Sequence, residues 1–179
     1  MNQANRELKS YWNYQGHGMI LGNRAILFLK FENPEKIPKN LKRDFRMYLL
    51  DTDTIIYNLK GNENVIQNIM RHINDPIKTS VPTLLELYYG AYKSQKKTSN
   101  LSKVKTLAQS MEVLPVGLET VEIFGLLKSE LESDGIRLDD FDLIIAAIAL
   151  AHNLILVTNN ENHFKRIDGL KLENWTTEE

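Results

Sequence analysis

An apolar run stops on an acid in Met47-Tyr48-Leu49-Leu50-Asp51-Thr52-Asp53, and this pattern sets the expected architecture of the chain. Four consecutive apolar residues predict a short buried strand over 47–50. Open sheets of parallel strands bind their ligands at the carboxyl ends of the strands. We therefore expect Asp51 at a ligand-binding edge, although an aspartate in this place also serves as a turn or cap residue.

Two more acids stand in apolar helical segments. Glu86 lies in the helical pattern of residues 81–92, and Asp142 opens the apolar run 142–151, which predicts a buried helix. Neither segment contains Lys or Arg, and a buried carboxylate is costly unless a cation compensates its charge. We predict that Asp51, Glu86 and Asp142 bind a divalent cation. Alternatively, Glu86 extends its carboxylate into solvent, and Asp142 only interacts with the positive end of its helix dipole.

Strands and helices alternate from residue 47 onward, which predicts a single α/β domain over 47–179 with a mainly parallel sheet sandwiched by helices. Residues 1–46 show no sustained period. We treat them as an appendage with an expected hairpin at 18–31, and Met47 as an alternative translation start. Strands are expected over 47–50, 77–81, 112–116, 154–158 and 170–174, and helices over 53–59, 63–74, 81–92, 99–110, 118–133 and 140–152.

Composition restricts the chemistry of the site. The 179 residues include no Cys, and no two His residues are three to five positions apart, so disulfides, thiolate chemistry and the usual zinc signatures are excluded. Hard oxygen ligands remain, which favours Mg²⁺ with Mn²⁺ as a substitute. The apolar patch 19–31 is too short and too charged to span a membrane, so we expect a cytoplasmic protein without membrane contact.

Charge is distributed unevenly along the chain. Residues 1–46 carry nine Lys and Arg against four acids, whereas residues 47–179 carry thirteen against nineteen. An acidic body argues against indiscriminate nucleic-acid binding, so an RNA ligand would need a local basic patch and the metal. One dense basic cluster is available for this role, and a merely solvated surface is its alternative. It consists of Lys93, Lys96, Lys97, Lys103 and Lys105.

Polar residues follow the predicted strand 154–158. The Thr158 hydroxyl is expected to hydrogen-bond a carboxylate ligand and so to orient it. Asn159 and Asn160 come next, where a fourth ligand would fit, and they also match an ordinary turn pair.

Four motifs in this order resemble the PIN-domain ribonucleases and, within them, the VapC toxins of type II toxin-antitoxin pairs. They are Leu-Leu-Asp-Thr-Asp at 49–53, Thr-Leu-Leu-Glu-Leu-Tyr-Tyr-Gly at 83–90, Asp-Asp-Phe-Asp-Leu-Ile-Ile-Ala-Ala at 139–147 and Leu-Val-Thr-Asn-Asn at 156–160. The resemblance covers 47–179 and implies a PIN-like three-layer α/β/α fold. It implies that Asp51, Glu86 and Asp142 hold Mg²⁺, that a fourth acidic position falls on or beside Asn160, and that Asp53 supports the ligands.

The resemblance also implies an activity and partners. The activity is Mg²⁺-dependent cleavage of structured RNA such as a tRNA, leaving a 5′-phosphate and a 3′-hydroxyl. From the residues themselves, Glu86 is the best candidate to accept the water's proton, because it is the acid on the longest arm. The partners are a cognate antitoxin and a second copy of the chain in a homodimer. Tyr88, Tyr89 and Tyr92 are candidates for such contacts, with core packing as the alternative.

Two other functions fit parts of the sequence. Asp51-Thr52-Asp53-Thr54 matches the opening motif of haloacid dehalogenase-like phosphatases, in which the first Asp is a nucleophile. That function leaves Glu86 without a role. A PIN-like binding module without catalysis is the second alternative, because the amide of Asn160 brings no negative charge to the site.

Overall fold

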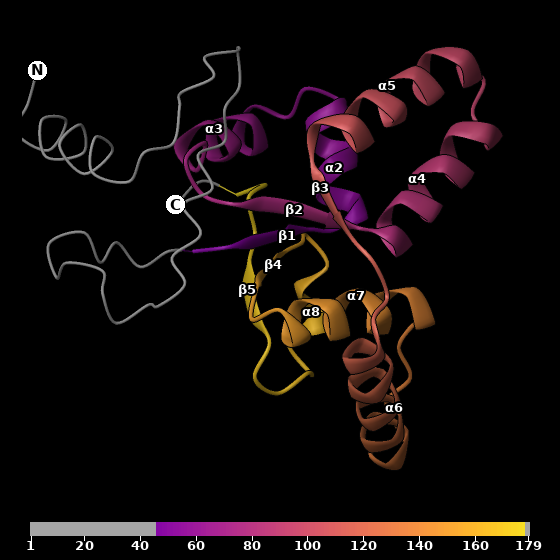
Figure 1. The fold of residues 1–179 in the computed structure, drawn as a ribbon, viewed down its shortest axis with the longest axis vertical. Coiled ribbons are helices and arrows are strands. Elements are labelled where there is room, and N and C mark those ends of the chain that lie inside the picture. Colours follow the sequence, from indigo (N-terminus) through magenta and orange to yellow (C-terminus); the bar gives the residue numbers. More distant parts are fainter. Residues whose placement is uncertain (1–45, 178–179) are drawn as a thin grey trace, which may run out of the picture. The chain divides into compact units, whose positions relative to one another are not determined.

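A five-stranded sheet organises the part of the chain that the computed structural model describes, residues 46–177. The strand order is β3-β2-β1-β4-β5, and every pairing is parallel, as the alternating pattern predicts (Figure 1). The strands are β1 (Tyr48–Leu50), β2 (Ile77–Ser80), β3 (Glu112–Leu114), β4 (Ile155–Val157) and β5 (Lys171–Glu173).

The helices connect these strands nearly where the sequence predicts them. They are α2 (Thr52–Leu59), α3 (Glu63–Arg71), α4 (Val81–Lys93), α5 (Lys97–Ser110), α6 (Leu118–Ser133), α7 (Asp140–Ala151) and α8 (Glu161–Phe164). The sequence analysis did not predict α8, because four residues are too few to show a helical period. The end of α7 is marked by Asn153, whose φ of 49° ends the helix in the left-handed region.

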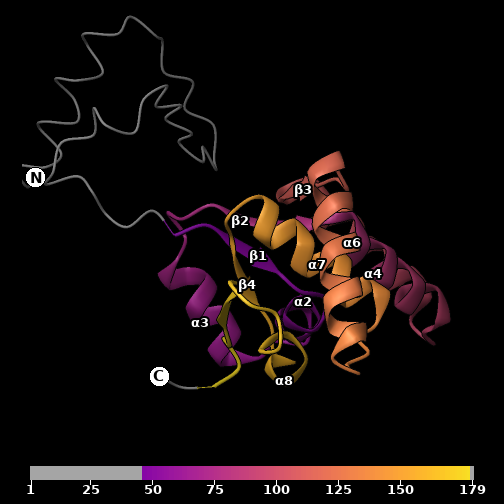
Figure 2. The same cartoon turned by 90° about the horizontal axis from the view of Figure 1, so that it is seen from below.

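The sheet separates two hydrophobic cores because successive side chains of a strand point to opposite faces. On β1, Leu49 belongs to one core, and Tyr48 and Leu50 belong to the other. Helices α6 and α7 cover the first face, and α2 to α5 contribute to the second core. Figure 2 shows α6 and α7 on one side of the sheet and α2 and α3 on the other. The three-layer α/β/α fold is therefore confirmed.

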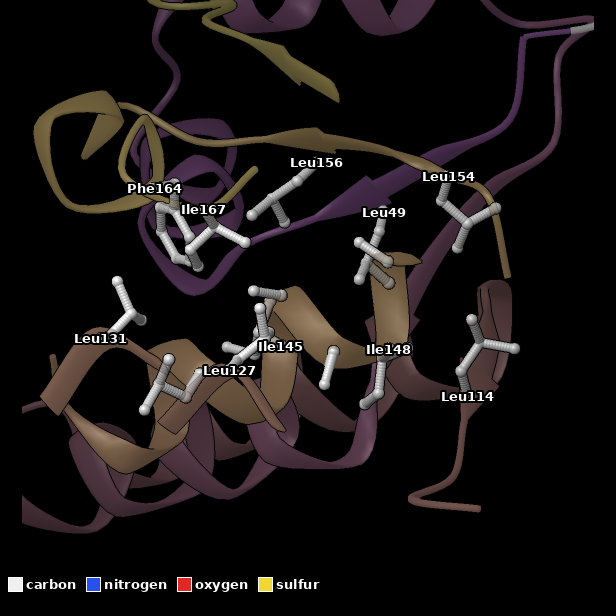
Figure 3. Packing of buried hydrophobic residues seen from close by; sticks show 14 residues of the cluster. Leu49, Leu114, Leu127, Leu131, Ile145, Ile148, Leu154, Leu156, Phe164 and Ile167 are labelled. Atoms are coloured by element: carbon white, nitrogen blue, oxygen red, sulfur yellow. The ribbon is translucent and has the colours of Figure 1, made fainter. Parts of the chain in front are cut away.

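Helix α7 forms the centre of the first core. Ile145 and Ile148 are fully buried against Leu49 of β1 and Leu156 of β4, and Phe164 of α8 packs into the same cluster (Figure 3). A helix that is apolar on all sides is accommodated here because α6 covers its outer surface. The packing fixes the first turn of α7, which carries Asp142.

Several predictions concern residues outside the described range. The proposed appendage over 1–46 and its hairpin at 18–31 fall almost entirely outside the described residues, and no structural observation bears on Met47 as an alternative start, so all three stay predictions. Within residues 46–177, no helix is both long enough and apolar enough to cross a bilayer.

Shortening Ile145 tests the importance of the first core. Ile145→Ala removes a fully buried side chain and is expected to lower the free energy of unfolding by about 2–5 kcal/mol, because it creates a cavity. Urea unfolding followed by circular dichroism measures this change. Leu126→Ala, on the exposed side of α6, is the control and should change stability by less than about 0.5 kcal/mol. Equal losses in the two variants would contradict the assigned core.

Candidate active site

The carboxyl ends of β1 and β4 define the edge on which the acids gather. The two strands are neighbours, with Leu50 opposite Val157, and the Asp51 amide donates to the Val157 carbonyl at 3.0 Å. The chain proceeds from β1 to one side of the sheet and reaches β4 on the other side. This reversal of strand order is the place at which α/β sheets bind ligands.

Asp51 is a helix cap and a buried acid at once. Its side chain is only 5 % exposed. Oδ1 accepts a hydrogen bond from the Thr52 amide at 2.6 Å, which caps α2, and Oδ2 accepts one from the Thr158 hydroxyl at 2.8 Å. The cap role that the sequence allowed is therefore real, and it holds the carboxylate rigidly at the edge of the sheet.

Glu86 reaches the same edge from α4. This helix begins directly after β2, where the Ser80 hydroxyl accepts a hydrogen bond from the Thr83 amide at 3.2 Å. The Thr52 hydroxyl donates to Glu86 Oε2 at 2.5 Å. Thr52 thereby links α2 to α4 and places the Glu86 carboxylate beside the residue that follows Asp51.

Asp53 ties the first turn of α2 to the loop after β4. Its Oδ2 accepts a hydrogen bond from the Asn159 amide at 3.0 Å, and its Oδ1 accepts one from the Thr54 hydroxyl at 3.2 Å. Asp53 thus holds in place the segment that contains Thr158 and Asn160. This contact agrees with the supporting position that we predicted, and its role toward a metal stays a prediction.

Asp142 lies in the first turn of α7, as predicted, because Asp139 caps that helix by accepting from the Phe141 amide at 2.9 Å. Asp142 Oδ2 lies 3.2 Å from Nδ1 of His163 on α8. The Asn160 amide side chain lies 2.7 Å from the same Nδ1. Asn160 and His163 therefore lie beside Asp142.

Burial, together with the charges of neighbouring acids, raises the pKa values of three of the acids. Burial, reinforced by the charges of Asp53 and Asp142, raises the pKa of Asp51 to about 7, against the opposing effect of its two hydrogen bonds. Burial also raises the pKa of Asp53, with a smaller contribution from Asp142. The pKa of Glu86 is raised mainly by burial and then by Asp142 and Asp139. The structure thus brings the predicted acids into one coupled cluster.

The cluster suits a hard divalent cation by its donor chemistry. Among the ion pairs of residues 46–177, none gives Asp51, Asp53 or Glu86 a Lys or Arg partner. Over the same residues, no three His, Cys, Asp or Glu side chains are arranged to coordinate one ion together. Mg²⁺ is commonly held by one or two carboxylates while keeping several waters. The oxygen donors therefore fit a hydrated Mg²⁺ rather than a cage made of protein ligands alone.

The five lysines of the basic cluster are all exposed and lie at the end of α4 and on α5 or directly before it. Lys93 donates to the Tyr89 hydroxyl at 3.1 Å, and the Lys97 ammonium lies 4.8 Å from the centre of the Tyr92 ring. Helix α4 therefore carries both Glu86 and one end of the basic cluster.

Sequence reasoning missed Thr52 and His163. Nothing in the sequence marks Thr52, because its partner Glu86 is 34 positions away. His163 has no second histidine at metal-ligand spacing, and its neighbour Asp142 is 21 positions away. His163 comes three residues after Asn160, and residues at this spacing in a helix share a face. Because α8 was not predicted, the spacing gave no signal from the sequence.

Comparison with known proteins identifies the class. A family model described as the PIN domain matches residues 48–170. This match spans more than half of the chain and includes the strands, helices and acids that form the edge described above. The chain belongs to the PIN-domain family.

Individual relatives place the chain in a narrower group. It is 37% identical over 131 residues to Ribonuclease VapC2 of Rickettsia felis, and the alignment covers 72% of this chain and 98% of that protein. It is 32% identical over 129 residues to the tRNA(fMet)-specific endonuclease VapC of Shigella flexneri, covering 72% of this chain and 98% of the relative. Within the PIN-domain family, the chain is a member of the VapC group.

Solved structures agree with this placement. A chain in the crystal structure of VapBC2 from Rickettsia felis bound to a DNA fragment from their promoter matches with a TM-score of 0.69 and 37% identity, covering 72% of this chain and 98% of that one. A chain of DNA-bound VapBC from Salmonella typhimurium matches with a TM-score of 0.68 and 32% identity, covering 73% and 98%. Because the chain belongs to the PIN-domain family, we reject the phosphatase alternative, which left Glu86 without a role.

The buried charge of Asp51 predicts a pH-dependent stability. The folded pKa of about 7 lies above the ordinary value of 3.8, so the folded chain binds the proton more tightly than the unfolded chain does. The free energy of unfolding should therefore fall as the pH rises from about 4 to about 7. In EDTA at pH 8, Asp51→Asn should increase the free energy of unfolding by roughly 1–4 kcal/mol, since one pKa unit is worth about 1.4 kcal/mol.

Urea titrations between pH 5 and pH 8 measure this effect, and the advantage of Asp51→Asn should shrink toward pH 5. Asp168→Asn, at an exposed acid, is the matched control and should show little change at either pH. If the difference in free energy of unfolding between Asp51→Asn and the wild type were the same at pH 5 and at pH 8, the raised pKa of Asp51 would be ruled out.

Proposed function

We propose that the chain is a Mg²⁺-dependent endoribonuclease toxin of a type II toxin-antitoxin pair, acting on structured RNA. The observation that carries this proposal is the buried Asp51, which is electrostatically coupled to Asp53 and Asp142 and has no Lys or Arg ion-pair partner in the described chain. Membership of the VapC group supports the same chemistry, because the relatives are named ribonucleases and endonucleases.

Asp51, Glu86 and Asp142 would hold the cation, directly or through water, and Mn²⁺ would substitute for Mg²⁺. When bound, the cation activates a water as nucleophile and polarises the scissile phosphodiester. The surrounding residues keep this arrangement rigid. Thr158 fixes Oδ2 of Asp51, and Asp53 anchors the loop that presents Thr158.

Glu86 is the proposed acceptor of the water's proton. Burial raises its pKa, which makes its carboxylate a better base than an exposed glutamate. The hydroxyl of Thr52 donates to Glu86 Oε2, so the other carboxylate oxygen, Oε1, would take the proton. The hydrolysis involves no covalent intermediate with the protein, and the products would carry a 5′-phosphate and a 3′-hydroxyl.

A tRNA is the proposed substrate. The support is a relative of 32% identity named as a tRNA(fMet)-specific endonuclease. The exposed lysine cluster of α4 and α5 lies on the helix pair that includes the Glu86 helix, so one RNA backbone would reach both. An RNA substrate of this kind implies a cytoplasmic location.

The proposed partners are a cognate antitoxin and a second copy of the chain. The support for an antitoxin is the set of solved toxin-antitoxin complexes that match this fold. Apolar side chains on α4 are available for such contacts: Leu85, Tyr89 and Tyr92 are 55%, 64% and 58% exposed. Tyr88 packs against the second core, so the core alternative applies to it.

Replacing Asp142 by Asn tests the proposed chemistry. The substitution keeps the size of the side chain and removes a charge from the cluster, so cleavage should fall by more than about 100-fold. Total RNA is incubated with the purified full chain in Mg²⁺ or in EDTA, and the cut ends are mapped. Asp51→Asn should behave in the same way.

The matched control is Asp168→Asn, which should cleave like the wild type. Undiminished Mg²⁺-dependent cleavage by Asp142→Asn would refute the assignment of the acids. RNA binding by the wild type without any cleavage would instead favour the binding module, which the neutral amide of Asn160 allows.

Charge reversal tests the basic cluster. The double variant Lys96→Glu/Lys97→Glu should weaken RNA binding and reduce the slope of log affinity against log salt by up to about 2, because each phosphate contact contributes nearly one unit. Filter binding at several salt concentrations, with Mg²⁺ replaced by Ca²⁺ to prevent turnover, measures the slope. Lys60→Glu/Lys171→Glu alters two lysines that are exposed elsewhere and should leave the slope unchanged. Identical slopes for the two double variants would leave the cluster without a role.

A further inference from the structure

The segment that follows β5, residues 174–176, connects the second core to the loop after β4. Trp175 is its anchor and is only 2% exposed. The Trp175 ring stacks on the His72 ring, with ring centres 5.3 Å apart and 7° between the planes, and it meets the Tyr48 ring edge-on at 5.0 Å. These contacts hold the segment against β1 and the end of α3.

The backbone of the same segment is held by side chains of α3. Nδ2 of Asn64 donates to the Thr176 carbonyl at 2.9 Å, and Nδ2 of Asn68 donates to the Trp175 carbonyl at 3.4 Å. The Thr176 amide donates to Oδ1 of Asn174 at 2.9 Å, which closes a turn. The side chains of Asn174 and Thr176 are therefore placed by contacts that involve none of the acids of the site.

Both of these side chains reach the loop after β4. Oδ1 of Asn159 accepts from the Thr176 hydroxyl at 2.9 Å and from Nδ2 of Asn174 at 3.4 Å. The hydroxyl also lies 2.7 Å from Oδ1 of Asn174, so two oxygens share its single hydrogen. Next to this contact, the Thr158 amide donates to the Glu173 carbonyl at 3.0 Å. The loop is thus held from the side of β5.

Asn159 connects this segment to the acids. Its backbone amide donates to Oδ2 of Asp53 at 3.0 Å, while its side chain is bound by Asn174 and Thr176. Asp53 lies in the first turn of α2, two residues after Asp51. If Asn159 moved, Asp53 would lose this hydrogen bond and its carboxylate could change its orientation beside Asp51.

We propose that Asn159 is a positioning residue for catalysis and that residues 174–176 form a clamp that holds it, so that the clamp sets the orientation of Asp53. Asn159 acts through Asp53 rather than on the reacting atoms. The inference rests on the proposed nuclease function and adds to it a contribution from a segment outside the acid cluster. Replacing the hydrogen-bonding neighbours of metal ligands typically costs about 10- to 100-fold in metal affinity or activity.

Amide hydrogen exchange, measured by NMR on the purified full chain without metal or RNA, tests the clamp itself. Thr176→Val removes the hydroxyl and keeps the shape of the side chain, so the Asn159 amide should exchange about tenfold faster. Thr176→Ser keeps the hydroxyl and should keep the slow exchange. Thr177→Val, at the exposed neighbouring residue, is the matched control and should exchange like the wild type. Unchanged exchange of Asn159 in Thr176→Val would overturn the clamp.

Cleavage kinetics with RNA and Mg²⁺ test the positioning role. Thr176→Val and Asn159→Ala should each lower kcat by about tenfold and change KM by less than about twofold, because the lysine cluster is untouched. The double variant should lose no more than either single variant, since both remove the same contact. Thr176→Ser and Thr177→Val should keep the wild-type kcat. Because Asn159 is exposed, Asn159→Ala supplies the kinetic test even if Thr176→Val does not fold.

The outcomes separate the inference from the proposed function. Faster exchange of the Asn159 amide with an unchanged kcat would overturn the positioning role, and so would additive losses in the double variant. A wild type that cleaves no RNA in Mg²⁺ would refute the proposed function and with it the catalytic role of Asn159. The exchange rates would still show whether residues 174–176 hold Asn159.

Discussion

The burial of the Asp51 carboxylate is the constraint on which the rest of the site depends. Its backbone amide bonds to β4, its Oδ1 caps α2 and its Oδ2 holds Thr158. One residue thus joins β1, helix α2, strand β4 and the loop after β4. The charge of the same side chain opposes folding above its raised pKa, because desolvation and like charges disfavour the ionised form. A bound cation would relieve this conflict.

The parallel sheet explains why such a conflict arises at one edge. All five strands point their carboxyl ends in the same direction, and the order reverses between β1 and β4. The helices that start at that edge carry Asp53, Glu86 and Asp142 in or near their first turns. Their positive ends favour acids locally, and together they concentrate negative charge that no Lys or Arg ion pair among residues 46–177 neutralises.

The surroundings of the acids divide into a rigid side and an open side. Thr158 and Asp53 lie on the rigid side, where hydrogen bonds to backbone amides and carboxylates fix the loop after β4. Asn160 and His163 lie on the open side, where Asp142 is partly exposed.

The sequence alone indicated the succession of the strands and of every described helix except α8, and it singled out three acids, because apolar periodicity and charge in apolar segments are local signals. It also gave grounds for the Thr158 hydrogen bond, since a hydroxyl after a buried strand faces that edge. Only the tertiary structure decided the strand order, the link from Thr52 to Glu86, the exposure of Tyr89 and Tyr92, and the approach of His163 to Asp142. These features depend on contacts between residues far apart in the chain, which no local pattern records.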